Sequence, residues 1–337
     1  MIHNSRDLRR RLQLAGYSEP ALAAAWPEWW SNDAESSPSA QAELRFSLAR
    51  KLGIDPRSLI ENSEPRFVWK TEAKFKHLAT ESADERAAIS SYGIALGRII
   101  IAATNAAPAS IEGASALQLR GTVLASKPFV SLSDLLAVCW GVGIPVIHLR
   151  VFPLSAKRMC AMTVRIGARF AILLGKDSNY PASIAFYLAH ELGHIALGHV
   201  RDGAAVVDLS DMLESKLDEE GDEEERTADR YALELLTGMS SPQVGTETQR
   251  FKATQLAANL LKTGAEAHIE PGVLALCFGN TTGDWAKANA AMKSIYTAPK
   301  PVWREVNRIA MQQLNFISLS DDLGSYIKAV TGSLGHD

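Results

Sequence analysis

The sequence predicts an α+β fold that is mostly helical and contains a small sheet of three strands. Through most of the 337 residues, apolar side chains recur at the spacing of amphipathic helices. Between residues 144 and 175 the pattern changes to short runs rich in β-branched and apolar residues, which are typical of strands. Hydrophobic residues make up 47% and charged residues 22% of the chain, so a sizeable core is expected without cross-links.

Residues 1–80 are expected to form a helical unit. Ser18 precedes an apolar run and marks a helix start. The stretch 31–40 is rich in Ser, Asp and Pro and is expected to be a loop. A longer helix then ends at Gly53, and Asp55, followed by proline, starts the next one.

Residues 81–240 are expected to form a core that carries the chemistry, and residues 241–337 a further helical region. Before the sheet, the core contains three predicted helices, at 81–106, 113–126 and 131–140. The three predicted strands follow at 144–151, 159–164 and 169–175. Two more helices, one beginning near Pro181 and one over 225–236, complete the core.

An HExxH pattern lies inside the helix that begins near Pro181, formed by His190, Glu191 and His194. Residues at positions i and i+4 lie one turn apart on one helix face, so both imidazoles can bind the same Zn²⁺. Glu191 is offset toward a water molecule on the ion, and the ion lowers the pKa of that water. The carboxylate can then accept a proton and pass it to a leaving amine. A buried histidine pair bonded to backbone groups is the alternative.

A third metal ligand is expected downstream, because catalytic zinc usually has three protein ligands and a water molecule. Glu223, Glu224 and Glu225 are consecutive in an acidic run, and such runs are most often a solvated face. We favour Glu225 because it alone has an acidic partner four residues later, Asp229, and shares its helix face with apolar positions. One of these two carboxylates can bind the metal while the other holds the N–H of a ligating histidine.

Two other side chains lie near these motifs. Tyr231 is on the same predicted helix as Glu225, where its hydroxyl would be a transition-state hydrogen-bond donor, with core packing as the alternative. His199 follows His194 by five residues, does not share its helix face well, and is expected to pack or to polarise its surroundings.

HELGH at 190–194, followed by the helix ERTADRYALELL, resembles the ImmA/IrrE family of metallopeptidases and, more broadly, the gluzincins. The resemblance covers roughly residues 113–240 and is specific at the two motif helices. In the second helix Thr227 replaces a Glu that the family usually has, Asp229 stands for Asn, and Tyr231 for Phe. The Thr227 position is not a metal ligand in the family, so the departure leaves the ligand set intact.

The resemblance implies a zincin-like core with a defined set of site residues. His190, His194 and Glu225 would bind zinc, and Glu191 would be the general base. Asp229 would be an acidic side chain that contacts a metal ligand rather than the metal itself. One Zn²⁺ per chain is the implied cofactor. Mn²⁺ stays open as the metal in the cell, because affinity order and availability compete.

Family members typically cleave a partner repressor with a helix-turn-helix fold, in stress, mobile-element or phage-defence systems, and the resemblance implies such a protein substrate. Many also carry an amino-terminal helix-turn-helix, which residues 8–60 partly resemble. Residues 27–30, Pro-Glu-Trp-Trp, interrupt the expected turn and recognition helix. Basic and acidic residues are nearly balanced over residues 1–80, which offers little support for DNA binding. We therefore favour a docking or sensing role. Trp26, Trp29 and Trp30 are expected to be core residues, with a binding surface as the alternative.

Composition constrains the surroundings of the protein. The formal net charge is -3, which is no signature of a nucleic-acid binder. The three cysteines lie far apart and suit a reducing compartment. No secretory signal and no apolar stretch long enough to span a bilayer is present, so a cytoplasmic protein without a membrane partner is expected.

The sequence thus favours a zinc-dependent endopeptidase. A DNA- or protein-binding regulator with a structural or latent metal site is the alternative. A component of a toxin–antitoxin or mobile-element system that acts by stoichiometric binding is a second alternative.

Overall fold

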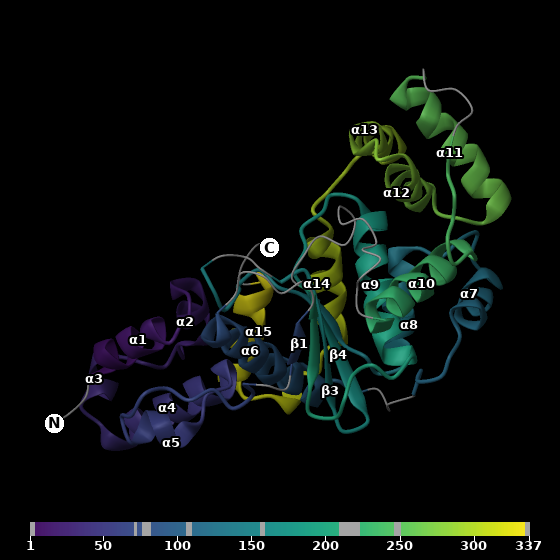
Figure 1. The fold of residues 1–337 in the computed structure, drawn as a ribbon. Helices are drawn as coiled ribbons and strands as arrows, with labels where there is room; N and C mark the ends of the chain where they lie inside the picture. Colours follow the sequence, from purple (N-terminus) through teal and green to yellow (C-terminus); the bar gives the residue numbers. More distant parts are fainter. Residues whose placement is uncertain are drawn as a thin grey trace.

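The structure is a computed structural model that describes residues 4–70, 73–75, 82–105, 110–155, 159–208, 223–245 and 251–333. Helices surround a single five-stranded sheet in this part of the chain (Figure 1). The expectation of a mixed, mostly helical fold is therefore confirmed, whereas the expected number of three strands is wrong.

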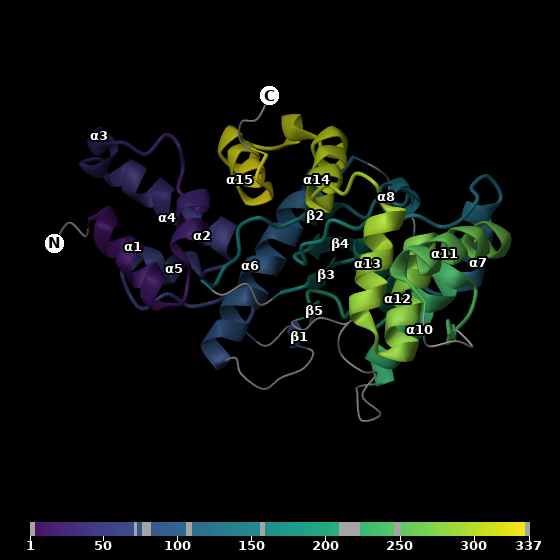
Figure 2. The same ribbon diagram turned by 90° about the horizontal axis from the view of Figure 1, so that it is seen from above.

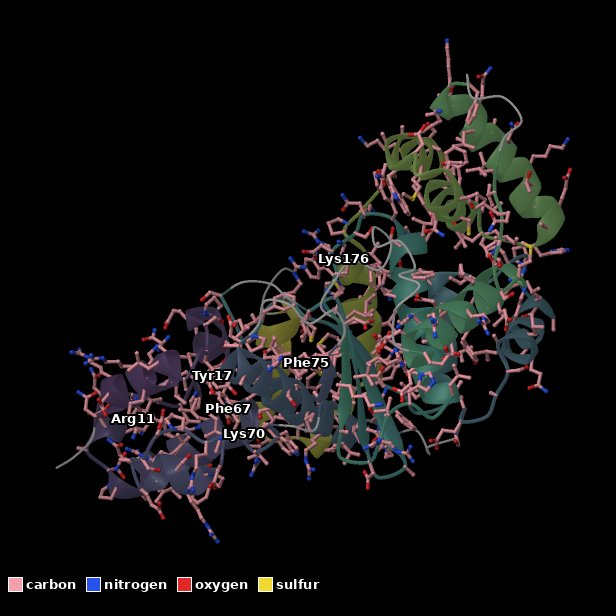
Figure 3. All side chains as sticks on the ribbon, in the orientation of Figure 1. Arg11, Tyr17, Phe67, Lys70, Phe75 and Lys176 are labelled. Carbon is pink, nitrogen blue, oxygen red and sulfur yellow. The ribbon has the colours of Figure 1, made fainter. Side chains whose placement is uncertain are left out.

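Helices make up most of the described amino-terminal part of the chain. They are α1 (Ser5–Leu14), α2 (Glu19–Ala25), α3 (Asn32–Glu35), α4 (Pro38–Leu52) and α5 (Pro56–Ile60). The Tyr17 hydroxyl donates to the carbonyl of Leu52, and its ring lies 5.8 Å from that of Phe67 (Figure 3). The expected loop over residues 31–40 is wrong in part, because Ser31 and Ser37 cap two helices inside it.

The tryptophans of this unit do not lie on a helix. Trp26 directly follows α2, and the Arg9 guanidinium lies 5.2 Å from its ring centroid. Trp26 and Trp30 are half-buried against the core, while Trp29 is 41% exposed. The expectation that all three are core residues therefore holds only in part.

The sheet has the strand order β1-β5-β3-β4-β2. Its strands are β1 (Ala73–Phe75), β2 (Val146–His148), β3 (Ala161–Ile166), β4 (Arg169–Leu174) and β5 (Ala205–Asp208). β3 pairs antiparallel with β4 and β5, whereas β1 pairs parallel with β5, and β2 with β4. The three expected strands correspond to β2, β3 and β4. β1 and β5 were not predicted because strands of three and four residues are too short to show alternation.

The two faces of the sheet are covered by different helices. The central helices are α6 (Ala83–Ala102), α7 (Ala116–Leu124), α8 (Leu132–Gly141), α9 (Pro181–Ala196) and α10 (Glu223–Thr237). On β3, the side chains of Met162 and Val164 contact α6, while Thr163 between them bonds to Glu191 of α9. Successive residues of a strand point to opposite faces, so α6 and α9 lie on opposite sides of the sheet. Asp208 at the end of β5 is buried on the α9 side.

The carboxy-terminal helices contact both other parts of the chain. They are α11 (Ala253–Ala267), α12 (Pro271–Thr282), α13 (Trp285–Ile295), α14 (Val302–Gln313) and α15 (Asp321–Thr331), with a 3₁₀ turn at Phe316–Ser318. α12 packs against α9. α14 packs against β2 (Figure 2). α15 reaches the amino-terminal unit, where buried Lys51 lies 2.6 Å from Asp322. None of the helices in the described ranges is long and apolar enough to cross a membrane.

Candidate metal centre

Two imidazoles of α9 meet inside the protein. Pro181 stands at the start of α9, and the helix is buried on nearly every side. His190 and His194 are 0% exposed, and their Nε2 atoms lie 2.9 Å apart. The HExxH spacing therefore places both rings as the sequence predicts, on one face of a single helix.

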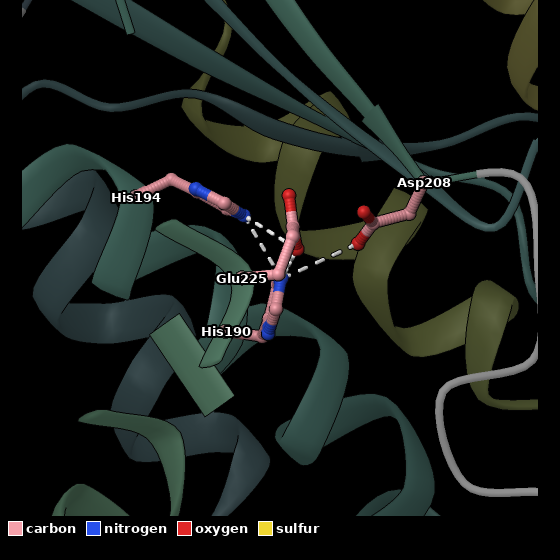
Figure 4. A group of neighbouring side chains, drawn as sticks. All are labelled: His190, His194, Asp208 and Glu225. Carbon is pink, nitrogen blue, oxygen red and sulfur yellow. Dashed lines mark hydrogen bonds and ion pairs between the residues drawn. The ribbon is translucent and has the colours of Figure 1, made fainter. Parts of the chain in front are cut away.

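Glu225 of α10 completes a triangle of donor atoms with the two histidines. Its Oε2 lies 3.2 Å from Nε2 of His190 and 3.4 Å from Nε2 of His194 (Figure 4). Zinc bonds of about 2.0 Å in a tetrahedron place neighbouring donors about 3.3 Å apart. The three separations, 2.9, 3.2 and 3.4 Å, are close to that value, so the donors fit around a single ion.

A glycine inside the HExxH pattern lets the two motif helices approach closely. A Cβ added at Gly193 would lie 3.1 Å from Cα of Ala228 and 3.2 Å from Cβ of Tyr231. Backbone and Cβ atoms cannot turn aside as the end of a flexible side chain can. The close contact between α9 and α10 at Gly193 thus sets how far Glu225 reaches toward the histidines.

Replacing Gly193 with alanine is expected to lower the free energy of unfolding of the metal-free protein by about 1–3 kcal/mol, the usual range for an overpacked core. Urea unfolding would measure it. Gly121 of α7 is the matched control, because a Cβ there meets no atom within 4 Å. Gly121→Ala is expected to be neutral or stabilising. Equal unfolding midpoints for the two variants would contradict the packing argument.

Hydrogen bonds on the far side of each ring orient the histidines. Nδ1 of His190 lies 2.8 Å from Oδ1 of Asp229, which can only accept, so this nitrogen carries the proton. Nδ1 of His194 lies 3.0 Å from Nδ1 of His199. Burial and then the proximity of His194 lower the pKa of His199, which favours its neutral form, and a neutral ring can accept at Nδ1 when Nε2 carries the proton. With Nδ1 protonated in both rings, the Nε2 lone pairs would point toward each other and toward Glu225, where they could bind a metal ion.

His199 therefore has a closer role than the sequence indicated. Helical spacing excludes it from the face of His194, but α9 ends at Ala196, and the chain turns back through Gly198, which has a φ of 73°. This turn returns the imidazole of His199 to His194. No periodic pattern in the sequence shows such a contact.

The general-base candidate, Glu191, is buried beside the donor triangle. Thr163 of β3 donates a hydrogen bond of 2.5 Å to its Oε2, while Oε1 has no hydrogen-bond partner among the described residues. Burial, and then the neighbouring carboxylate of Asp208, raise the pKa of Glu191 well above its ordinary value. A carboxyl group with a raised pKa and one free oxygen is suited to accepting and returning a proton.

Asp208 joins the group as a residue that the sequence analysis missed. It ends β5, is 0% exposed, and places Oδ2 3.6 Å from Nε2 of His190 (Figure 4). Donor atoms of His190, His194, Asp208 and Glu225 all lie within 4.8 Å of one another, and this group could hold a metal ion. An aspartate at the end of an apolar run was the available signal, but that signal is common at strand ends.

The remaining predicted residues lie outside the group. Glu223 pairs with Arg226, and Glu224 with Lys74 of β1, so of the three consecutive glutamates only Glu225 belongs to it. The Tyr231 hydroxyl donates to the carbonyl of Ala114 at 3.2 Å, and burial raises the pKa of this phenol to about 12. We therefore assign Tyr231 to packing between α10 and the chain before α7.

The chemistry of the group suits a cation. The two Nε2 atoms lie 2.9 Å apart, with carboxylates of Glu225 and Asp208 beside them. Either a metal ion or a proton on one imidazole would offset the negative charge of these carboxylates, and imidazole with carboxylate is a donor set that suits zinc. No protein-family model matches the sequence, and neither a curated protein nor a solved structure shows significant similarity to it.

Proposed function

We propose that the protein is a zinc-dependent endopeptidase of the ImmA/IrrE type. The observation that carries the proposal is the buried triangle of His190, His194 and Glu225, with the carboxyl group of Glu191 beside it. His194 and Glu225 lie on two different helices, 31 residues apart in the sequence, and yet meet at one point. Each histidine is held by a second side chain. A histidine pair that only packs would need none of these carboxylates.

Glu191 carries the proton transfer in this proposal. A zinc ion held by the triangle would polarise the scissile carbonyl and lower the pKa of a water molecule. Thr163 fixes one oxygen of Glu191, which leaves Oε1 to take a proton from the attacking water. The same carboxyl group then donates this proton to the leaving nitrogen, so no second acid is needed.

The sheet offers a place for an extended substrate. Among the described strands, β1 forms the end of the sheet on the side of β5, and β5 carries Asp208 into the group. Lys74 of β1 forms an ion pair of 2.6 Å with Glu224, which directly precedes the metal ligand Glu225. We propose that the substrate main chain pairs with the sheet at this end, as in other strand-addition complexes. The resemblance in the motif helices points to a helix-turn-helix repressor as the protein cleaved.

Removing and restoring the metal tests the proposal. Purified protein would be incubated with a library of peptides from a bacterial proteome, and new peptide termini would be identified by mass spectrometry. Wild type loaded with one equivalent of zinc is expected to produce a narrow set of cleavages that disappear after chelation and return with zinc. Cleavages that persist in the chelated protein would point to a contaminating peptidase. If every cleavage persisted, none would depend on the metal, and the proposal would be contradicted.

A specific observation also favours the alternative of a regulator with a structural or latent metal site. Structural zinc sites have four protein ligands, whereas catalytic sites keep one position open. Asp208 supplies a fourth protein group here. A chain that binds zinc but shows no cleavage in any library would support this second function.

A further inference from the structure

We propose that Asp208 is a fourth protein ligand of the metal and closes its coordination sphere in the resting protein. The inference rests on the metal site of the proposed function but not on hydrolysis. Neither HExxH nor the helix of Glu225 indicates this residue. It comes from the position of β5 in the fold.

Among the described residues Asp208 has no cationic partner besides His190, and the neighbouring carboxyl group of Glu191 adds a second acidic group beside it. Both carboxylate oxygens are buried, and neither has a hydrogen-bond partner among the described residues. Within those residues its one ion-pair contact is with His190, at 3.6 Å from Oδ2 to Nε2. A buried carboxylate without donors is strongly unfavourable unless it binds a cation or stays protonated. Two other carboxylates nearby differ, because Glu191 accepts from Thr163 and Asp229 accepts from His190.

Geometry places the carboxylate of Asp208 within reach of the same ion, 3.6 Å from Nε2 of His190 and within 4.8 Å of the other donors. The donor triangle leaves one corner of a tetrahedron, and Asp208 approaches from the sheet, opposite the helices that carry the other three (Figure 4). Two neutral imidazoles and two carboxylates would also neutralise a divalent ion, which a buried site favours. The donor set is therefore complete in number, type and charge.

The consequence is a metal that is closed until Asp208 moves. Hydrolysis needs a position for water and substrate on the metal, so the side chain of Asp208 must leave the ion first. Its backbone is held in the sheet, where its carbonyl accepts from N–H of Cys160 at 2.7 Å. A rotation of one side chain at the end of β5 is then enough to open the site.

Asp208→Asn tests the assignment through metal binding rather than activity. Zinc affinity, measured by competition with a chromogenic chelator, is expected to fall by at least about tenfold, the lower bound for losing even an outer partner of a ligand. Asp202→Asn is the matched control. Its carboxylate accepts from N–H of Gly167 in an exposed turn, so zinc affinity should stay at the wild-type value.

The stability of the metal-free protein separates a ligand from a merely structural residue. Removing an uncompensated buried charge is expected to raise the urea midpoint of metal-free Asp208→Asn above that of wild type. A structural aspartate would show the opposite sign. Zinc should then stabilise the variant less than it stabilises wild type, because the affinity for the ion is lower.

Cobalt spectra report the fourth position directly. With Co²⁺ in place of zinc, wild type is expected to show the intense visible bands of a four-coordinate ion and no response to added azide. Asp208→Ala opens one position, so azide should shift its bands at millimolar concentration. This second variant keeps the inference testable if Asp208→Asn folds poorly.

The outcomes distinguish the inference from the proposed function. Unchanged zinc affinity in Asp208→Asn together with an azide response in wild type would overturn the role of Asp208 and leave the peptidase proposal standing. Absence of metal binding in wild type would overturn both. Weaker binding in Asp208→Asn without any peptide cleavage by wild type would support Asp208 as a ligand and favour a latent or structural site.

Discussion

Replacing Glu191 with glutamine is expected to slow peptide hydrolysis by about 10²–10⁴-fold, the usual contribution of a positioned acid–base group. The amide has nearly the same shape and can still accept from Thr163, but it has no lone-pair oxygen basic enough to take a proton. Glu191 is not among the donors of the metal group, so zinc should remain bound at about one ion per chain. Cleavage rate and zinc content, measured on the same preparation, provide the test.

Glu270→Gln is the matched control for this substitution. Glu270, at the start of α12, is another buried glutamate, and burial is the main cause of its raised pKa. Its carboxylate accepts a hydrogen bond from the hydroxyl of Tyr296. Its replacement should leave the cleavage rate unchanged. Full activity in Glu191→Gln with zinc bound would remove Glu191 from the mechanism.

Replacing Glu225 with alanine is expected to lower zinc affinity by more than about 100-fold, since a lost ligand should exceed the largest effect of an outer partner. The variant would keep the two histidines but lose the oxygen that lies 3.2 and 3.4 Å from them. The zinc content, measured by elemental analysis, is expected to fall from about one ion per chain in wild type to a small fraction of that in the variant.

Glu224→Ala controls for the loss of one acidic side chain at the start of α10. Glu224 pairs with Lys74 rather than with the histidines, so this variant should retain its zinc. Equal zinc content in Glu225→Ala and wild type would show that another residue is the third ligand. A wild type without zinc would instead support a packed histidine pair.

Together the two substitutions separate the candidate functions. An endopeptidase loses its effect in both variants, whereas a regulator with a structural metal site loses it in Glu225→Ala but keeps it in Glu191→Gln. If the regulator were supported, the tryptophans after α2 would be the next side chains to replace, beginning with the exposed Trp29.

Local signals made much of the fold predictable. Ser82 caps α6 with its side chain accepting from N–H of Glu85, and Gly53 ends α4 in the left-handed conformation. Both depend on residues within a few positions, as does the placement of His190 and His194 on one face of α9. Glu225 was also predictable, because its spacing from Asp229 lies within one helix.

Other contacts became visible only in the tertiary structure. They join residues whose spacing in the sequence matches neither a helix nor a strand, so no sequence pattern indicates them. β1 pairs with β5 across more than a hundred residues, and neither strand is long enough to alternate. His199 reaches His194 only because the chain turns after α9. Spacing within two helices was enough to predict that His190 and His194 share a helix face and that Glu225 lies beside them. Only the folded sheet brought Asp208 to the same point, because the contact depends on where β5 lies rather than on any spacing near the motif helices.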